Sequence, residues 1–144
     1  IKVRVSRPGL SVVARKGHPL RNARSVTQLA SCEWLSTSTL NLPGGPIERL
    51  FESRGLPPPR PVIVCEYYNT VVALLAKSDM IGLMQRRALK EGHARESRQE
   101  LKLVETIPGV TAGIYTRAGT PLTHAAAAMA KAASAVARDL ADLK

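Results

Sequence analysis

Two polar segments of the chain have residue types and positions suited to holding a small molecule. The first, Thr37–Gly45, follows Trp34 and Leu35, which we expect to lie in a strand, and precedes an expected helix, Ile47–Arg54. Pro46 suits the first position of that helix. Backbone N–H groups at the start of a helix attract anions, although the glycine pair is equally typical of a flexible turn. The candidate binding residues here are Thr37, Ser38, Thr39, Asn41, Gly44 and Gly45.

The second polar segment, Glu66–Thr70, lies between a β-branched run, Val62–Val64, and an apolar stretch, Val71–Lys77. We expect the run to form a strand buried on both faces, and Asn69 to cap a helix over the apolar stretch. Ser78 and Asp79 then turn into a further strand, Met80–Met84, which completes a right-handed parallel unit. Ligands bind beyond the carboxyl ends of such strands. The candidate binding residues of this segment are Tyr67, Tyr68 and Asn69.

No set of residues predicts catalysis, a metal site or a cofactor site. The three histidines, His18, His93 and His124, have no nucleophile motif beside them. Glu66 stands alone after its strand, so we expect it to orient a ligand or form an ion pair rather than act as a general base. Cys32 and Cys65 lack metal-ligand spacing and are expected to be reduced core thiols. The chain is therefore expected not to be an enzyme.

Length and charge narrow the class of protein further. With 144 residues the chain can form one domain or two small lobes. Its formal net charge of +10 favours an anionic partner, with a solvated basic surface as the alternative. Aromatic residues make up only 3% of the chain, which argues against a surface that stacks nucleic-acid bases. No segment approaches the ~20 apolar residues of a membrane span, and we expect a cytoplasmic protein without membrane contact.

The remaining pattern is of alternating strands and helices. A helical turn, Val26–Ala30, should be capped by Ser25, and Gln85–Glu91 should be helical before a charged loop or frayed helix, His93–Glu100. Further strands are expected at Val3–Val5, Leu10–Ala14, Leu101–Val104 and Val110–Tyr115.

The chain should end in an alanine-rich helix capped by Thr120 or Thr123. Its apolar residues recur at helical spacing, so we expect the stripe to pack on the helix's own sheet, with a coiled coil as the alternative. The stripe consists of Leu122, Ala126, Met129, Ala133, Val136, Leu140 and Leu143.

Several of these segments, in this order, resemble a known family. They are LSVVARKGHPL at Leu10–Leu20, then SVTQLASCEWLS, IERLFESRGLPPP, VCEYYNTVVALLAKSDMIGLM, LKLVETIPG and GIYTRAGTPLTHAAAAM. Together they resemble the effector-binding domain of LysR-type transcriptional regulators over nearly the whole chain. The stretch ALLAKSDMIGLM departs from the family's commoner glycine-rich pattern, because Asp79 and Met80 stand in the glycine region.

The resemblance implies an α/β fold like that of type 2 periplasmic binding proteins, here the second lobe plus the C-terminal strand and helix of the first. Residues 1–9 would be an interlobe crossover, 10–107 the second lobe and 108–144 the return to the first. Effector contacts would fall on Thr37–Gly45 and Tyr67–Asn69, and the contact between two subunits on the helix Thr70–Lys77. DNA would be bound only by a helix-turn-helix domain preceding Ile1.

The leading hypothesis is therefore an effector-sensing domain that binds a small, anionic molecule and acts in a homo-oligomer. A solute-binding protein of a transport system with the same fold is the runner-up. An enzyme on this fold is the third hypothesis, but it would need an acid, base or nucleophile in the cleft. The residues preceding Ile1 would discriminate between the first two, since a helix-turn-helix favours a regulator and a signal peptide favours a transport protein.

Overall fold

A computed structural model describes residues 2–6, 9–37, 43–89, 94–107, 109 and 112–142. The chain divides into two compact units, one of Gly9–Gly109 and the other of Ile1–Pro8 with Val110–Lys144. The assignment of these units to two lobes remains a prediction. Within the described residues, no helix combines the length and the hydrophobicity that crossing a membrane requires.

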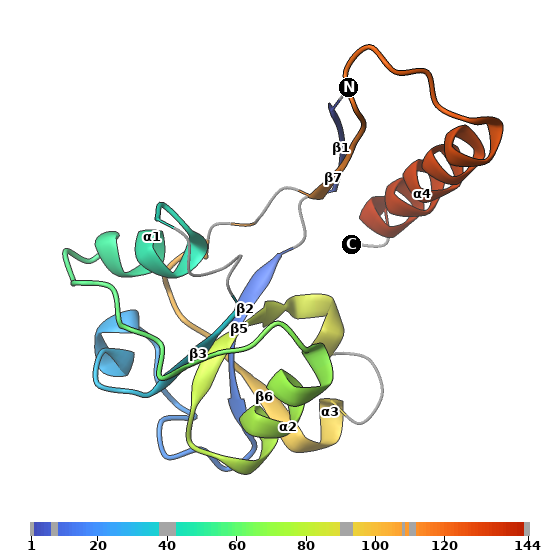
Figure 1. The fold of residues 1–144 in the computed structure, drawn as a ribbon. Coiled ribbons are helices and arrows are strands. Elements are labelled where there is room, and N and C mark those ends of the chain that lie inside the picture. The colour runs from blue at the N-terminus through green and yellow to red at the C-terminus, as the bar shows by residue number, and fades with distance from the viewer. Residues whose placement is uncertain are drawn as a thin grey trace. The chain divides into compact units, whose positions relative to one another are not determined.

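The larger unit is built on a mixed five-stranded sheet (Figure 1). The strand order is β4-β3-β5-β2-β6, and β2 pairs antiparallel with both β5 and β6, whereas β3 is parallel to both β4 and β5. The strands are β2 (Leu10–Arg15), β3 (Trp34–Ser36), β4 (Ile63–Val64), β5 (Ile81–Gln85) and β6 (Arg98–Leu101). The predicted strand, helix and parallel strand are thus present, with β3 lying between β4 and β5.

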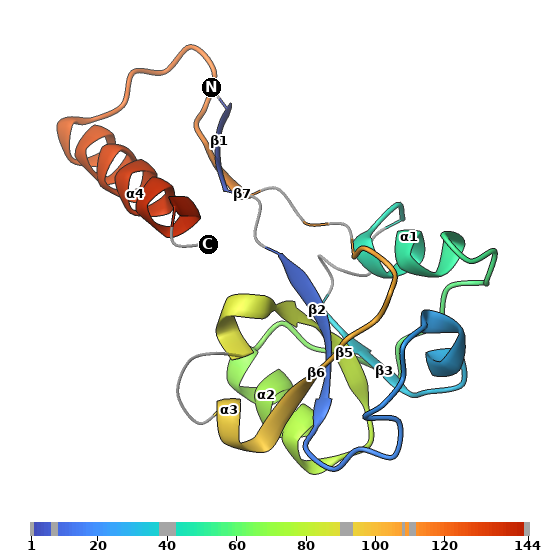
Figure 2. The same cartoon turned by 180° about the vertical axis from the view of Figure 1, so that it is seen from behind.

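Helices cover both faces of this sheet. Because successive strand residues point to opposite faces, neighbouring residues of β3 contact different helices. Leu35 joins the apolar cluster under α2 (Tyr68–Lys77), which contributes the buried Val71 and Leu75. Helix α2 lies in front of the strands in Figure 1 and behind them in Figure 2. The neighbouring Trp34 instead contacts Phe51 of α1 (Pro46–Glu52), with ring centroids 5.4 Å apart.

The 3₁₀ turn η1 (Val26–Leu29) begins as predicted, at Ser25. Ser25 and Gln28 form a capping box, in which each side chain accepts hydrogen bonds from backbone N–H groups near the start of the turn. Trp34 Nε1 donates to the carbonyl oxygen of Leu29 at 3.2 Å, so this turn is fixed against β3.

The His-Pro-Leu turn after β2 is held by a buried histidine. His18 Nδ1 accepts the Leu20 N–H at 3.0 Å, and Nε2 lies 3.0 Å from the carbonyl oxygen of Asp79. These two contacts fit the neutral tautomer that carries its proton on Nε2. An ion pair of 2.7 Å between Arg15 and the Asp79 side chain joins the same two turns. His18 is therefore a structural residue that links the end of β2 to the start of β5.

The strand predicted at Val62–Val64 to be buried on both faces is instead an edge strand of two residues. Val62 and Val64 are 55% and 51% exposed. The prediction was wrong because, within the part of the chain that the structure describes, β4 pairs with β3 alone, and β-branched composition cannot distinguish an edge strand from a central one.

The strand predicted at Leu101–Val104 is also misplaced. Strand β6 spans Arg98–Leu101, so it shares only Leu101 with the predicted strand. The first three residues of β6 fall in the segment His93–Glu100, which was expected to be a charged loop or frayed helix. Glu100 lies in the ladder and accepts hydrogen bonds from Ser11 Oγ at 2.7 Å and Arg86 Nε at 3.1 Å. Pairing with β2 therefore outweighs the polar pattern of the segment. Before it come the 3₁₀ helix η3 (Arg86–Leu89) and the single turn α3 (Ala94–Ser97), and the predicted His93 lies outside the described residues.

The smaller unit contains a two-stranded antiparallel sheet of β1 (Lys2–Ser6) and β7 (Ala112–Tyr115), together with α4 (His124–Asp142). Thr123 Oγ1 accepts the Ala126 N–H at 3.2 Å and so caps α4, as predicted. The expectation that the apolar stripe packs on its own sheet is not met, since Met129 is 72% exposed and Val136 is 56% exposed. Two short strands offer too little surface to cover that stripe.

Candidate functional site

The two polar segments singled out from the sequence begin side by side at one edge of the larger sheet. Strands β3 and β4 run parallel, with Ser36 paired to Val64. The Cys65 N–H donates to the carbonyl oxygen of Ser36 at 2.9 Å. Thr37 and the segment after Cys65 therefore leave the sheet from adjacent carboxyl ends, which is where ligands bind in sheets of this kind.

Helix α1 begins at Pro46, close to the predicted start, but a backbone N–H group beside it is already hydrogen-bonded within the chain. Gly44 has a φ of +68°, a left-handed conformation that favours glycine, whereas Gly45 is the N-cap in an extended conformation open to any residue. Pro46 is the first helical residue and has no N–H. The Gly44 N–H donates to the Glu48 carboxylate. One of the backbone donors proposed for an anion is thus occupied by the chain's own carboxylate.

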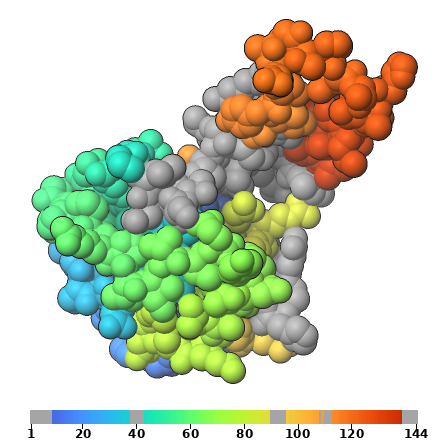
Figure 3. Space-filling view, in the orientation of Figure 1, coloured from blue at the N-terminus to red at the C-terminus, as the bar shows by residue number. Residues whose placement is uncertain are grey.

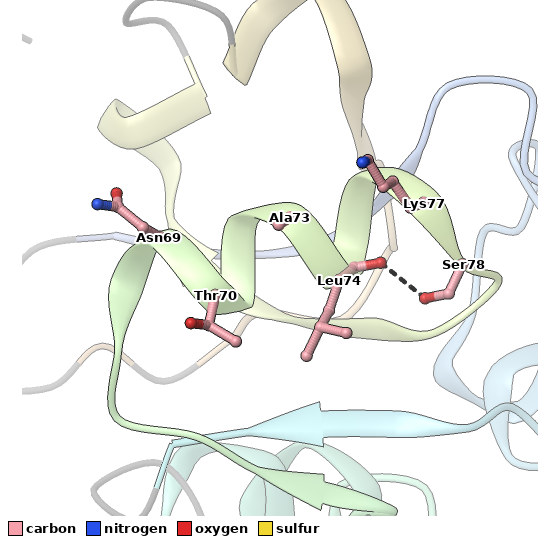
Figure 4. Close-up of a pocket in the computed structure, with 6 residues that line it drawn as sticks. All are labelled: Asn69, Thr70, Ala73, Leu74, Lys77 and Ser78. Carbon is pink, nitrogen blue, oxygen red and sulfur yellow. Dashed lines mark hydrogen bonds between the residues drawn. The ribbon is translucent and has the colours of Figure 1, made fainter.

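The start of α2 also differs from the prediction at one residue. The N-cap is Tyr67 rather than Asn69, and its side chain makes no capping bond. Asn69 lies in the first turn of the helix, where its side chain is exposed and points away from the helix axis (Figure 4). Tyr67 is 78% exposed and Tyr68 is 54% exposed. These three residues present hydroxyl and amide groups to solvent at the carboxyl end of β4.

Of the remaining predicted residues, Thr37 is half-buried directly after β3. Ser38, Thr39 and Asn41 lie outside the described residues.

A hollow of about 410 Å³ lies along one side of α2 (Figure 4). It is lined by Asn69, Thr70, Ala73, Leu74, Lys77 and Ser78. Its walls come from one helix and the turn that follows. The hollow is therefore an open surface feature, which another protein surface can contact. The surface of the segment from β4 to α2, coloured green, is open to view in Figure 3. The sequence predicted the apolar helix. It did not predict the hollow or that Ser78 lines it, because the shape of a surface depends on the residues that pack around the helix.

The chemistry of the site is that of hydrogen bonding. Thr37 follows β3, and Tyr67, Tyr68 and Asn69 follow β4, so hydroxyl, phenol and amide groups lie after the carboxyl ends of these strands. Cys65 Sγ lies 3.8 Å from the carbonyl oxygen of Tyr67. Burial raises the pKa of the other thiol, Cys32. Among the described residues, no group of three or more histidine, cysteine, aspartate or glutamate side chains could hold a metal ion. The arrangement is suited to binding a small polar molecule.

Comparison with known proteins gives both a family and a fold. The sequence profile described as "LysR substrate binding domain" matches residues 3–138. The regulatory domain of CcmR from Synechocystis PCC6803, in complex with 2-PG, is similar in structure, with a TM-score of 0.72, 17% identity, and coverage of 95% of this chain and 66% of that one. The effector-binding domain of QuiR in complex with shikimate gives a TM-score of 0.73 at 14% identity, with 96% and 66% coverage.

A third similar structure is the effector domain of the regulator AmpR of Pseudomonas aeruginosa, with a TM-score of 0.67, 16% identity and coverage of 98% of this chain and 66% of that one. The fold is therefore α/β and like that of periplasmic binding proteins. The chain spans 66% of the length of each of these three domains.

Proposed function

Because the chain belongs to the LysR substrate-binding domain family, we propose that it is the effector-sensing part of a LysR-type transcriptional regulator. It binds a small organic anion and thereby modulates transcription. The observation that carries this proposal is the pairing of Ser36 with Val64, which starts both polar segments at one sheet edge. The family match favours this role over that of a transport protein or an enzyme, since the family is one of regulatory domains.

We propose that the effector contacts Thr37–Gly45 from one side and Tyr67–Asn69 from the other. Two structurally similar domains are described in complex with 2-PG and with shikimate, which supports a small ligand. The net charge of +10 supports an acidic one.

Calorimetric titration of the intact protein with a panel of small organic acids tests the function. We expect saturable binding of at least one acid, with one site per chain. Binding only of neutral molecules would contradict the proposed anionic effector, and a product released from a bound acid would contradict the absence of enzymatic activity.

The neighbourhood of Gly44 leads to a prediction about the same titration. An anion bound at the start of α1 must compete with the Glu48 carboxylate for the Gly44 N–H. A charge near a helix terminus is worth about 0.3–1 kcal/mol, so Glu48→Gln should tighten the binding of the acid about two- to fivefold. Glu52→Gln, at the exposed far end of the same helix, is the matched control and should leave affinity unchanged. Equal or weaker binding by the Glu48 variant would place the anion elsewhere.

We further propose that two copies of the chain associate through the exposed side of α2. That side holds the hollow lined by Thr70, Ala73 and Leu74. Val64 of the edge strand β4 and Val62, which precedes that strand, are exposed as well. An apolar surface of this kind on a strand and an adjacent helix marks an interaction site.

Leu74→Glu is expected to convert the dimer to a monomer. Leu74 lines the hollow and is only partly buried against the core of its own chain. Losing the burial of a leucine in the contact costs about 1.5–3 kcal/mol, so the dissociation constant should rise at least tenfold. Light scattering at micromolar concentration measures this change, with Val104→Glu, at an exposed apolar residue outside α2, as the control. A dimer that persists in the Leu74 variant would rule out this surface. Leu75 is unsuitable for the test because it is fully buried in the core.

We also propose two properties of the whole regulator. A helix-turn-helix domain, rather than this chain, would contact DNA. The protein would act in the cytoplasm, where its operator lies.

A further inference from the structure

A buried carboxylate holds the segment that leaves the larger unit after β6. The Val104 N–H donates to the carbonyl oxygen of Arg24 at 2.8 Å. The next residue, Glu105, accepts a hydrogen bond from Ser25 Oγ at 2.6 Å and another from Arg54 Nε at 2.8 Å, both on Oε1. The Glu105 side chain is 4% exposed. This segment is therefore fixed by one side chain and one backbone bond rather than by a sheet ladder.

The two partners of Glu105 come from distant parts of the chain. Ser25 is the N-cap of η1, and Arg54 directly follows the C-cap of α1. At its other end, α1 begins with the Gly44–Gly45 pair of the proposed effector site. The chain after Glu105 passes, near Gly109, from the larger unit to the smaller one. Glu105 thus stands between the helix that carries an effector loop and the segment that connects the two units.

The bonds of Glu105 depend on its charge. Burial raises the pKa of its carboxyl group, but hydrogen bonds from the Ser25 and Arg54 side chains and from the backbone N–H groups of Glu105 and Val26 lower it, and the net direction is down. The carboxylate is therefore ionised at neutral pH, and its bonds weaken only when the pH falls through the lowered pKa. Its second oxygen, Oε2, is buried and has no hydrogen-bond partner within the described residues. Both side-chain bonds therefore end on Oε1, and the backbone N–H groups of Val26 and Glu105 support the same carboxylate.

We propose that Glu105 is a positioning residue that couples the displacement of α1 to the connecting segment after β6. Arg54 lies just beyond the end of α1 and 46% of its side chain is exposed, whereas Leu50 and Phe51 fix the helix in the core, so a displacement of α1 moves Arg54 together with these packed residues. An effector that moves the start of α1 would then pull on Glu105 and on the chain leading to the smaller unit. This coupling rests on the proposed function for its trigger, whereas the contacts that transmit it are independent of any ligand.

Hydrogen–deuterium exchange of the full chain, without ligand, tests the coupling. Glu105→Gln should speed exchange several-fold in Pro46–Glu52 and in Val26–Leu29, while exchange in β2 stays unchanged. Arg54→Gln should speed exchange in Pro46–Glu52 to a similar extent. Because Arg54 acts through Glu105, the double variant should exchange no faster in Pro46–Glu52 than Glu105→Gln alone. Glu33→Gln and Arg60→Gln, at exposed positions, are the matched controls and should have no effect.

Faster exchange confined to residues 102–107, or additive effects of the two variants, would overturn the proposal. If Glu105→Gln also speeds exchange in β2 by loosening the whole unit, Ser25→Ala decides. It removes the bond to Glu105 and the cap of η1 but leaves the bond between Arg54 and Glu105 in place, so the diagnostic result is the exchange rate in Pro46–Glu52. Faster exchange in both Val26–Leu29 and Pro46–Glu52 would support the coupling, and a change in Val26–Leu29 alone would refute it. A failure here leaves the effector-binding proposal intact, and absence of effector binding would leave these exchange rates unaltered.

Discussion

Trp34→Ala is expected to lower the free energy of unfolding by about 3–5 kcal/mol, the usual cost of deleting a buried aromatic side chain. Trp34 is fully buried, packs edge to face against Phe51, and donates a hydrogen bond to Leu29. The variant therefore loses apolar contacts and one of the two hydrogen bonds to the Leu29 carbonyl oxygen, which keeps the bond from the Cys32 N–H. Because η1 and α1 are both anchored on this ring, the start of the proposed effector loop should be loosened as well.

Urea unfolding followed by circular dichroism measures this loss. Tryptophan fluorescence cannot be used, since Trp34 is the only tryptophan of the chain. Trp34→Phe is the matched control, because it keeps most of the ring contact but not the N–H, and it should lose distinctly less stability. A loss below ~1 kcal/mol for the alanine variant would mean that the ring is not the anchor of these two elements.

Gly82→Val is expected to destabilise the larger unit by ~3 kcal/mol or more, at or above the upper end of the usual cost of overpacking. Gly82 lies in β5 between β2 and β3. A Cβ at this position would lie 2.8 Å from the backbone carbonyl oxygen of Leu35 and 3.6 Å from the Leu75 side chain. The carbonyl belongs to the neighbouring strand, so relief requires the sheet itself to shift.

The matched control for this variant is Gly9→Val, because no atom lies within 4 Å of a Cβ built at Gly9. Thermal unfolding of both variants gives the comparison. If the two lose similar stability, the cost at Gly82 is one of backbone entropy and not of the close approach of β3.

Local signals in the sequence predicted the elements whose causes are local. Ser25 starts η1, Pro46 starts α1 and Thr123 caps α4, each through contacts made within a few residues. The elements that were predicted wrongly depend on distant partners. The sequence of Val62–Val64 is typical of a buried strand. In the described residues, however, β4 has β3 as a neighbour on one side alone, which makes it an edge strand.

The candidate site divides in the same way. That Thr37 and Tyr67 follow neighbouring parallel strands agrees with the family resemblance, which places both segments at the effector site. The occupation of the Gly44 N–H by Glu48 was not predicted, although the spacing of the two residues suits a helix whose early carboxylate reaches back to its start. The exposure of Tyr67 and Tyr68 could not be predicted either, since it reflects where β4 lies in the sheet.

The position of β2 in the sheet has a consequence for the synthesis of the protein on the ribosome. Its ladder partners are β5, which begins at Ile81, and β6, which begins at Arg98. At ~5–20 residues per second, a ribosome needs several seconds to deliver them after β2 has been made. Throughout that interval Val12 and Val13, which become fully buried, have no sheet to join. The nascent chain is therefore exposed to aggregation during its own synthesis, and a chaperone that holds apolar segments should improve its yield more than one that acts on the finished fold.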